Sequence, residues 1–458
     1  MIVEFQGAPE STHAIQFATP SLGDQSYLIV SGNDGALIDP QLDIDRFEKW
    51  LTDTGTVLRW VLETHVHNDY VSGGKVLAER HGAAYVLPIG SDVTFDHSPI
   101  LDGDSLPVGL CAIRAMHTPG HTPHHMSYVL ESPGTAGAGA GALAVFSGGS
   151  MLVGAVGRSD LLGPELTEQL ARAQYRSVNK MVNELPDPTI VVPTHGAGSF
   201  CSTSPAVDTT TSTIALEKTR NPALTAIDED SFVTEQLSGY ALFPSYYAHM
   251  GPLNREGNAS AEPISLSELT PHQVTDAAAT AIVIDLRRGG IFAAGHIPGS
   301  VNVPMSVDAG AYIGWALPWK TELVLLSDRP ADIEDIRVQL HRIGIRSIVG
   351  VVDDGLKKWL AEGRPVTSYR TATFREMAEE SPSTIVDARD PLESRISALP
   401  DTVNIHFSRI AEELGHVGPG TVWVHCQSGY RAAIAASLLA RADREVVLVD
   451  DDFANRAD

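Results

Sequence analysis

The sequence predicts an α/β protein of several domains, and three observations support this prediction. The chain has 458 residues, roughly two to four times the length of a typical domain. Its first 250 residues alternate short β-rich runs with stretches in which apolar residues recur at helical spacing. Beyond them, a strand–helix–strand alternation occurs twice, about a hundred residues apart, which is typical of a duplicated α/β unit.

The N-terminal strand candidates are short runs rich in β-branched and aromatic residues. They cover residues 26–30, 35–40, 56–65, 83–88, 126–130, 142–148 and 189–196. Helical spacing of apolar residues occupies 42–52, 71–81 and 165–185. The small-residue run GTAGAGAGA at 134–142 predicts a flexible hairpin tip.

The second part of the chain begins after residues 251–263, which are rich in Gly, Pro and Asn and predict a linker. The first copy of the duplicated unit has strand candidates at 281–287, 321–328 and 346–355, and the second at 384–390, 421–429 and 444–451. The joint between the copies lies near 363–371. We therefore predict three domains, at residues 1–250, 262–369 and 370–458.

The composition argues against several classes of function. Lys and Arg number 32 against 57 Asp and Glu, and the formal net charge of −25 disfavours nucleic-acid partners. No run of 18 apolar residues and no leader pattern is present, so we expect a cytoplasmic protein without a membrane segment. Cys111, Cys201 and Cys426 are too few for a disulfide framework and favour a reducing compartment. Whether the chain forms a homo-oligomer stays open.

A candidate nucleophile, Cys426, directly follows the apolar strand candidate TVWVH. The residues QSGYR at 427–431 and a helical run come next, so a strand end, a glycine-containing loop and a helix start are adjacent. Such a junction directs backbone N–H groups at an anion, which favours the nucleophilic thiolate. We predict Cys426 as the nucleophile in a loop with Ser428 and Gly429, which Arg431 closes or uses to contact a substrate anion.

This loop resembles the active-site loop of the rhodanese family of sulfurtransferases, in which four residues separate Cys from Arg. Cysteine-dependent phosphatases have one residue more, so the spacing from Cys426 to Arg431 favours sulfur chemistry. GHIPGSVNVP at 295–304 is also rhodanese-like, but the equivalent strand end of the first copy has Ser327 and Asp328 and no thiol. The resemblance implies two doubly wound α/β domains, the first inactive and the second catalytic.

Histidines in the first part of the chain predict a metal site. Of 17 histidines, 11 precede residue 251. THVHND follows a strand candidate and places polar residues two apart, which an extended backbone would direct to one side. The cluster HTPGHTPHH and the segment PTHG also lie at strand ends. The candidate metal ligands are His65, His67, Asp69, His121 and His195.

Three segments, THVHNDYVSG, HTPGHT and VGRSDLL, together resemble the metallo-β-lactamase superfamily, in which two sheets pack between outer helices as an αββα sandwich. TPGHT and VGRSDL are similar to its glyoxalase II and persulfide dioxygenase branch. With the two rhodanese-like domains behind it, the chain resembles persulfide dioxygenase–rhodanese fusions. That resemblance implies one Fe(II), with zinc as the alternative, bound by His65, His121 and a carboxylate at the position of Gly149. Gly149 can ligate nothing.

The function that the resemblance implies is sulfide and persulfide metabolism. The iron domain would oxidise a low-molecular-weight persulfide with O2, and the Cys426 persulfide would exchange sulfur with thiosulfate, sulfite or thiols. One alternative is a dinuclear thioester hydrolase of the glyoxalase II type, against which Tyr70 and Gly149 argue, because they replace two of its ligands. Another is a non-catalytic sulfur carrier or scaffold without metal. We also consider Cys201 as a sulfur carrier facing the metal pocket.

Overall fold

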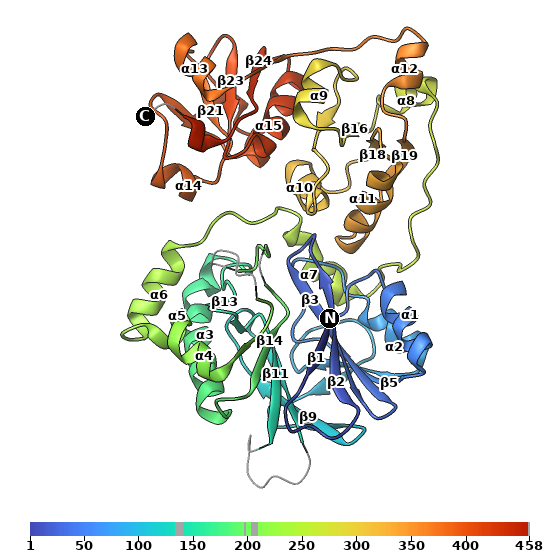
Figure 1. Ribbon diagram of the computed structural model, residues 1–458, viewed down its shortest axis with the longest axis vertical. Coiled ribbons are helices and arrows are strands. Elements are labelled where there is room, and N and C mark those ends of the chain that lie inside the picture. The colour runs from blue at the N-terminus through green and yellow to red at the C-terminus, as the bar shows by residue number, and fades with distance from the viewer. Residues whose placement is uncertain (133–140, 197, 203–208, 457–458) are drawn as a thin grey trace. The chain divides into compact units, whose positions relative to one another are not determined.

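The computed structural model describes residues 1–132, 141–196, 198–202 and 209–456, in two compact units, 1–262 and 263–458 (Figure 1). Residues 134–140 of the predicted hairpin tip lie outside the described residues. Within the described part of the chain, no helix is both long enough and apolar enough to cross a membrane.

Two sheets that pack face to face form the centre of the first unit. The seven-stranded sheet has the order β1 (Ile2–Glu4), β2 (Thr12–Thr19), β3 (Asp24–Ser31), β4 (Asp34–Ile38), β5 (Val57–Leu62), β6 (Ala84–Pro88), β7 (Ser98–Ile100). The six-stranded sheet has the order β15 (Ser212–Thr213), β14 (Ile190–Pro193), β11 (Ala142–Gly148), β10 (Met126–Glu131), β9 (Cys111–His117), β8 (Ser105–Val108). Tyr27 and Ile29 of the first sheet and Tyr128 and Phe146 of the second share one buried core.

Helices cover the outer faces of both sheets (Figure 1). On the first sheet these are α1 (Asp45–Thr54) and α2 (Gly74–His81), and α2 packs on β5 and β6. The apolar outer face of the second sheet packs against the helical region that begins with α3, as Val145 and Val191 share a core with Met181 and Phe232. The elements of this region are the hairpin β12 (Met151–Leu152) and β13 (Ala155–Val156), α3 (Pro164–Glu184), α4 (Ile214–Arg220), α5 (Pro222–Thr225) and α6 (Glu229–Ser238).

The helix α7 (Tyr247–Glu256) occupies the first half of the predicted linker, so the linker prediction is wrong for residues 251–256. Asn254 of this helix explains the difference. Its Nδ2 donates to the carbonyls of His67 (2.9 Å) and Tyr70 (2.8 Å), and its Oδ1 accepts from the Ser72 N–H at 2.9 Å. The helix therefore belongs to the first unit, where it holds the histidine-bearing loop after β5.

The second unit consists of two parallel α/β repeats. The first has the strand order β17 (Val301–Asn302), β16 (Ile282–Asp285), β18 (Leu323–Leu326), β19 (Ile348–Val352), with helices α8 (Pro271–Ala277), α9 (Gly289–Ala294), α10 (Ala309–Ala316), α11 (Pro330–Arg342) and α12 (Lys357–Ala361). The second has the order β20 (Arg370–Ala372), β24 (Val446–Val449), β23 (Val422–His425), β21 (Ile385–Asp387), β22 (Thr402–Asn404). Its helices are α13 (Phe374–Glu380), α14 (Pro391–Ile396) and α15 (Tyr430–Arg441), with 3-10 turns at Phe407–Arg409, Leu414–His416 and Phe453–Asn455.

The duplication extends to individual hydrogen bonds. In each repeat an asparagine amide donates to two carbonyls at the end of one strand, β16 in the first repeat and β21 in the second. An arginine two residues after the last residue of that strand, an aspartate, forms an ion pair with it. The residues are Asn302, Asp285 and Arg287 in the first repeat and Asn404, Asp387 and Arg389 in the second.

Substitution of Asn302 by Ala tests this shared network. Asn302 is fully buried, and its loss takes a donor from the Arg287 carbonyl and leaves that of Asp285 with the Val303 N–H, so the free energy of unfolding should fall by about 2 kcal/mol. Urea denaturation of the full chain measures the change. The matched control is Asn455→Ala at an exposed position, for which we expect a change within about 0.5 kcal/mol. Equal effects of the two substitutions would contradict the role of Asn302.

Candidate metal centre and cysteine loop

The histidine-bearing loops of the first unit come together at the ends of strands from both sheets. His65 follows β5, His121 follows β9 and His195 follows β14. All three side chains are buried. Their ring centroids lie 4.7 Å apart for His65 and His121, 5.1 Å for His121 and His195, and 5.6 Å for His65 and His195.

Potential ligand atoms form three overlapping groups within the described residues. In each group, one atom of every member lies within 4.8 Å of the others. The groups are His65, His121 and His195; His67, Asp69 and His195; and Asp39, Glu63 and His67. All five residues predicted as ligands therefore lie in this region, but no single group contains all of them.

A hydrogen bond at Nδ1 holds each ring of the first group. The Nδ1 of His121 lies 2.8 Å from the carbonyl oxygen of Arg158, and that of His195 lies 2.9 Å from Asp24 Oδ1. The Nδ1 of His65 lies 2.9 Å from the hydroxyl of Thr64. The buried Nε2 atoms of His65 and His195 have no hydrogen-bond partner among the described residues.

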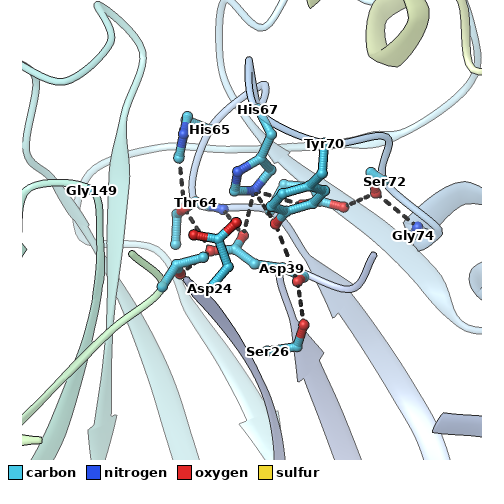
Figure 2. Close-up of polar contacts among 12 residues, drawn as sticks. Asp24, Ser26, Asp39, Thr64, His65, His67, Tyr70, Ser72, Gly74 and Gly149 are labelled. Atoms are coloured by element: carbon cyan, nitrogen blue, oxygen red, sulfur yellow. Dashed lines mark hydrogen bonds and ion pairs between the residues drawn. The ribbon is translucent and has the colours of Figure 1, made fainter. Parts of the chain in front are cut away.

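The carboxylate of Asp39, at the end of β4, connects these loops (Figure 2). It accepts hydrogen bonds from the backbone N–H of Thr64 (2.7 Å), from the Thr64 hydroxyl (2.8 Å) and from the Thr194 hydroxyl. Burial alone would raise the pKa of Asp39, but the charge of His67 and these hydrogen bonds hold it below its usual value. Asp39 is therefore an ionised acceptor that orders the residues next to His65 and His195.

The ring of His67 lies against that of His65, with the centroids 4.1 Å apart, but its Nε2 atom is directed at carboxylates. Its Nε2 lies 3.2 Å from both Asp39 Oδ1 and Glu63 Oε2 and 2.9 Å from the Tyr70 hydroxyl (Figure 2). Burial alone would lower the pKa of His67, but these carboxylates raise it well above its ordinary value. His65 and His67 therefore lie side by side but belong to different groups of potential ligand atoms, which share His195.

Two further carboxylates adjoin His195. Asp24 Oδ1 lies 2.9 Å and Asp69 Oδ2 3.3 Å from its Nδ1. Burial raises the pKa of Asp24 and of Asp69 to about 7, and for Asp69 the charge of Asp24 adds to this effect. Sequence analysis missed Asp24, since nothing near it in the chain indicates a polar site.

His125 supports the backbone of Gly149, the position where a carboxylate ligand was expected. Its Nε2 accepts the Gly149 N–H at 3.0 Å, and its Nδ1 lies 2.9 Å from the Thr118 hydroxyl. Burial lowers the pKa of His125 to about 3, so the ring is neutral. Sequence analysis noted His125 as part of the HTPGHTPHH cluster. It did not predict that His125 accepts a hydrogen bond from Gly149, because Gly149 follows a different strand, β11.

Arg158 connects His121 to segments that are distant in the sequence, through hydrogen bonds of its side chain and of its carbonyl. Its guanidinium donates to both oxygens of Asp160, at 2.7 and 2.8 Å, and to the carbonyls of Phe200 (3.0 Å) and Ala241 (2.8 Å). Its own carbonyl accepts from His121. Asp160, the acidic residue of the VGRSDLL segment, therefore positions Arg158.

Cys201 is buried, with its sulfur 3.8 Å from the Tyr247 hydroxyl. Burial, followed by the charges of Asp69 and Asp24, raises the pKa of its thiol well above the ordinary value. The structure thus places Cys201 close to the centre, as suggested, but as a neutral thiol.

The cysteine loop of the second unit joins β23 to α15. Cys426 follows the last residue of β23 and is 1% exposed. Gly429 has φ +83°, and a Cβ there would lie 2.5 Å from Asp450 Oδ1. Only glycine therefore fits the turn that starts α15 three residues after the thiol. Ser428 is exposed on this loop.

The guanidinium of Arg431 forms a two-point ion pair with Glu393 of α14, in which Nη2 donates to Oε2 at 2.9 Å and Nη1 donates to Oε1. Burial would lower the pKa of Arg431, but Glu393 raises it. Glu393 thus partly neutralises the positive charge of Arg431 near Cys426. Sequence analysis did not identify Glu393, which lies 38 residues before its partner.

The first repeat forms a wall beside the cysteine loop. Tyr430 donates to or accepts from the Ser306 hydroxyl at 2.8 Å, and its ring centroid lies 4.9 Å from that of Tyr312. Burial raises the pKa of Tyr312 to about 12, with the charges of Asp308 and Arg431 acting in opposite directions. The repeat without a thiol therefore shapes the surroundings of the other repeat's nucleophile.

Ser327 takes the position of Cys426 in the first repeat, according to the registers of the two sheets. Asp332 follows Ser327 by five residues, just as Arg431 follows Cys426. The Ser327 hydroxyl donates to Asp332 Oδ2 at 2.9 Å. The first repeat thus replaces both the thiol and the positive charge with a mutually bonded Ser–Asp pair.

Comparison with known proteins relates each part to a family. Residues 270–362 and 371–455 match the family model of the rhodanese-like domain. A probable metallo-hydrolase of Burkholderia pseudomallei is 33% identical over 204 residues, covering 36% of this chain and 67% of that protein. The human mitochondrial persulfide dioxygenase ETHE1 is 29% identical over 211 residues, covering 46% of this chain and 72% of that protein.

Among solved structures, a metallo-beta-lactamase from Staphylococcus aureus is similar with a TM-score of 0.66 and 28% sequence identity, covering 75% of this chain and 99% of that one. These matches confirm the predicted fold class, a metallo-β-lactamase-like αββα sandwich followed by two rhodanese-like α/β domains.

Substitution of Arg158 by Met tests its role in connecting distant segments. The change removes hydrogen bonds to three residues and leaves Asp160 without its cation, so the free energy of unfolding should fall by about 3 kcal/mol. Thermal and urea denaturation measure the loss. Arg172→Met is the control, because Arg172 forms ion pairs at the surface, and such pairs contribute little to stability. Comparable losses for both variants would show that Arg158 has no special role.

Proposed function

Because the chain belongs to the metallo-β-lactamase-fold persulfide dioxygenase–rhodanese fusion family, we propose that it transfers sulfane sulfur through a persulfide on Cys426 and oxidises persulfides at its N-terminal metal centre. The rhodanese-like domains and the similarity to persulfide dioxygenases support a sulfur-metabolising enzyme. The observation that carries the first half of the proposal is the buried Cys426 between β23 and the start of α15.

The sulfurtransfer proceeds in two displacements. The Cys426 thiolate attacks the outer sulfur of thiosulfate, the S–S bond breaks, and sulfite leaves with the bonding electrons. A thiolate or sulfite then attacks the outer sulfur of the Cys426 persulfide, and Cys426 leaves as a thiolate. The backbone N–H groups of residues 427–431 and the N-terminus of α15 stabilise the negative charge in both steps.

The residues of the N-terminal centre fit a metal ion, because buried imidazole nitrogens of His65 and His195 face one another with no hydrogen-bond partner in the described part of the chain. A bound Fe(II) would supply open positions for O2 and a persulfide, whereas zinc would supply only Lewis-acid chemistry. Asp24 and Thr64 orient the rings, and the buried surroundings exclude bulk water. Sulfite, which oxidation of a persulfide there would yield, would be an acceptor for the Cys426 persulfide. All three cysteines are free, which suits the cytoplasmic location that we propose.

A dinuclear thioester hydrolase is the rival function. It needs two ions, and His195 belongs to both the His65 group and the Asp69 group. Since its Nδ1 is bonded to Asp24, it has one nitrogen to offer and serves one ion. This supports a mononuclear centre.

Substitution of Cys426 by Ser tests the proposed nucleophile. We expect thiosulfate:cyanide sulfurtransfer to fall to the background of the assay, because a hydroxyl is not ionised in this loop at neutral pH. The control Cys111→Ala removes a thiol in the other unit and should leave the rate unchanged. Retained activity in the Cys426 variant would refute the assignment.

Substitutions of Arg431 and of Glu393 should change the KM for thiosulfate in opposite directions. Arg431→Gln removes the positive charge beside Cys426, so the KM for thiosulfate should rise about tenfold, or about 1.4 kcal/mol. Glu393→Gln removes the negative partner and should lower that KM. Steady-state kinetics at low ionic strength measures both. A rise in KM for both variants would mean that the pair acts only through loop geometry.

A further inference from the structure

Gly149, which leaves the expected ligand set incomplete, forms a wall of the slot that holds the His121 ring. A Cβ at position 149 would lie 2.3 Å from Cδ2 of that ring, and a Cβ at Gly157, on the other wall, would lie 2.8 Å from its Nδ1. The two glycines are joined by a hydrogen bond from the Gly157 N–H to the Gly149 carbonyl, 3.0 Å long. The ring cannot retreat, because Arg158 holds its Nδ1. Gly149 is therefore required by the position of His121.

The hydrogen bonds of the three rings determine which nitrogen carries the proton. The partner of His121 Nδ1 is a carbonyl, which only accepts, and His195 Nδ1 faces the carboxylates of Asp24 and Asp69. Both Nδ1 atoms therefore carry the proton. In each ring the remaining nitrogen, Nε2, carries a lone pair, and in His195 this atom has no hydrogen-bond partner among the described residues.

The same conclusion holds for His65 through its neighbour Thr64. The Thr64 hydroxyl has one proton, which it donates to Asp39 Oδ2 at 2.8 Å. Toward His65 it can therefore only accept, so His65 Nδ1 donates and its Nε2 keeps a lone pair. The three Nε2 lone pairs therefore lie close together, and none of these nitrogens carries a proton that it could donate to another. Such an arrangement is unfavourable unless a cation lies between them.

We propose that His65, His121 and His195 hold one divalent metal ion through their Nε2 atoms, and that His195 takes the place of the carboxylate ligand missing at Gly149. The proposal refines the metal centre of the proposed function and is independent of the chemistry at Cys426. Imidazole nitrogens suit Fe(II) and Zn(II). Asp24 is the carboxylate that orients His195. Because the three imidazole ligands are neutral, it also provides negative charge near the divalent ion.

The Nε2 atoms of the other two buried histidines of the region are already engaged, and the Nδ1 of His67 lies 3.8 Å from Asp69 Oδ1. The Nε2 lone pair of His125 accepts the Gly149 N–H. The Nε2 of His67 lies against Asp39, Glu63 and the Tyr70 hydroxyl. The proposed set therefore includes His65 but not His67, the second histidine of the HxH motif.

Proton NMR of the Co(II)-substituted full chain tests the proposal. A histidine bound through Nε2 gives one strongly shifted, solvent-exchangeable Nδ1–H signal, so we expect three such signals. His195→Gln should remove one of them and weaken Co(II) binding at least tenfold. His81→Gln, at a surface position of the same unit, is the control and should change neither. Two signals in the unaltered protein, no bound Co(II), or three signals in the His195 variant would overturn the proposal.

The variant Gly149→Asp gives an independent result. If Gly149 makes room for His121, the larger side chain displaces the ring, and bound metal per chain falls at least tenfold while circular dichroism shows the fold retained. If the Gly149→Asp variant instead binds more metal than the unaltered chain, the three-histidine set is wrong. Persulfide-dependent O2 consumption by the iron-loaded unaltered chain separates the two proposals, since three signals without O2 consumption would remove the dioxygenase function and leave the ligand set standing.

Discussion

The buried carboxylate of Asp39 is the constraint on which the N-terminal centre depends. It lies at the end of β4 and is fully buried, yet it stays ionised because Thr64, Thr194 and His67 satisfy it. Thr64 and Thr194 come from different sheets, so this one group ties both sheets together where their loops meet. Each threonine directly precedes a proposed ligand, and the network thereby sets both the position and the protonated nitrogen of His65.

The second unit builds its centre on the same geometric principle, with the reactive group just beyond a parallel strand. Comparison of its two repeats separates the residues that maintain the fold from those proposed for catalysis. Both repeats keep the asparagine and the Asp–Arg pair at the end of β16 or β21, but one repeat places Ser327 and Asp332 where the other has Cys426 and Arg431. The first repeat retains the fold and packs against the cysteine loop through Ser306 and Tyr312.

Periodicity and motifs predicted the fold class and the strands that precede His65 and His195, because buried strands leave a β-branched pattern in the sequence. The strand before His121, β9, was not among the predicted strands. They did not predict contacts between distant segments. The direction of the His67 Nε2 atom depends on Asp39 and Glu63, and the pairing of Arg431 depends on Glu393. The helix over 251–256 was missed because composition suggested a linker, whereas Asn254 bonds to the loop carrying His67. From the sequence, Gly149 indicated only that a carboxylate ligand is missing. The structure adds that a Cβ at this position would collide with the ring of His121.

The central claim is that hydrogen bonding to Asp39, Asp24 and the Arg158 carbonyl presents three imidazole nitrogens to one ion. Anomalous diffraction at the iron edge from crystals of the iron-loaded full chain tests this claim most directly. The account predicts one peak per chain, bonded to the Nε2 atoms of His65, His121 and His195. A peak bonded instead between His67, Asp39 and Glu63, a second peak at Asp69, or no peak at all would contradict it.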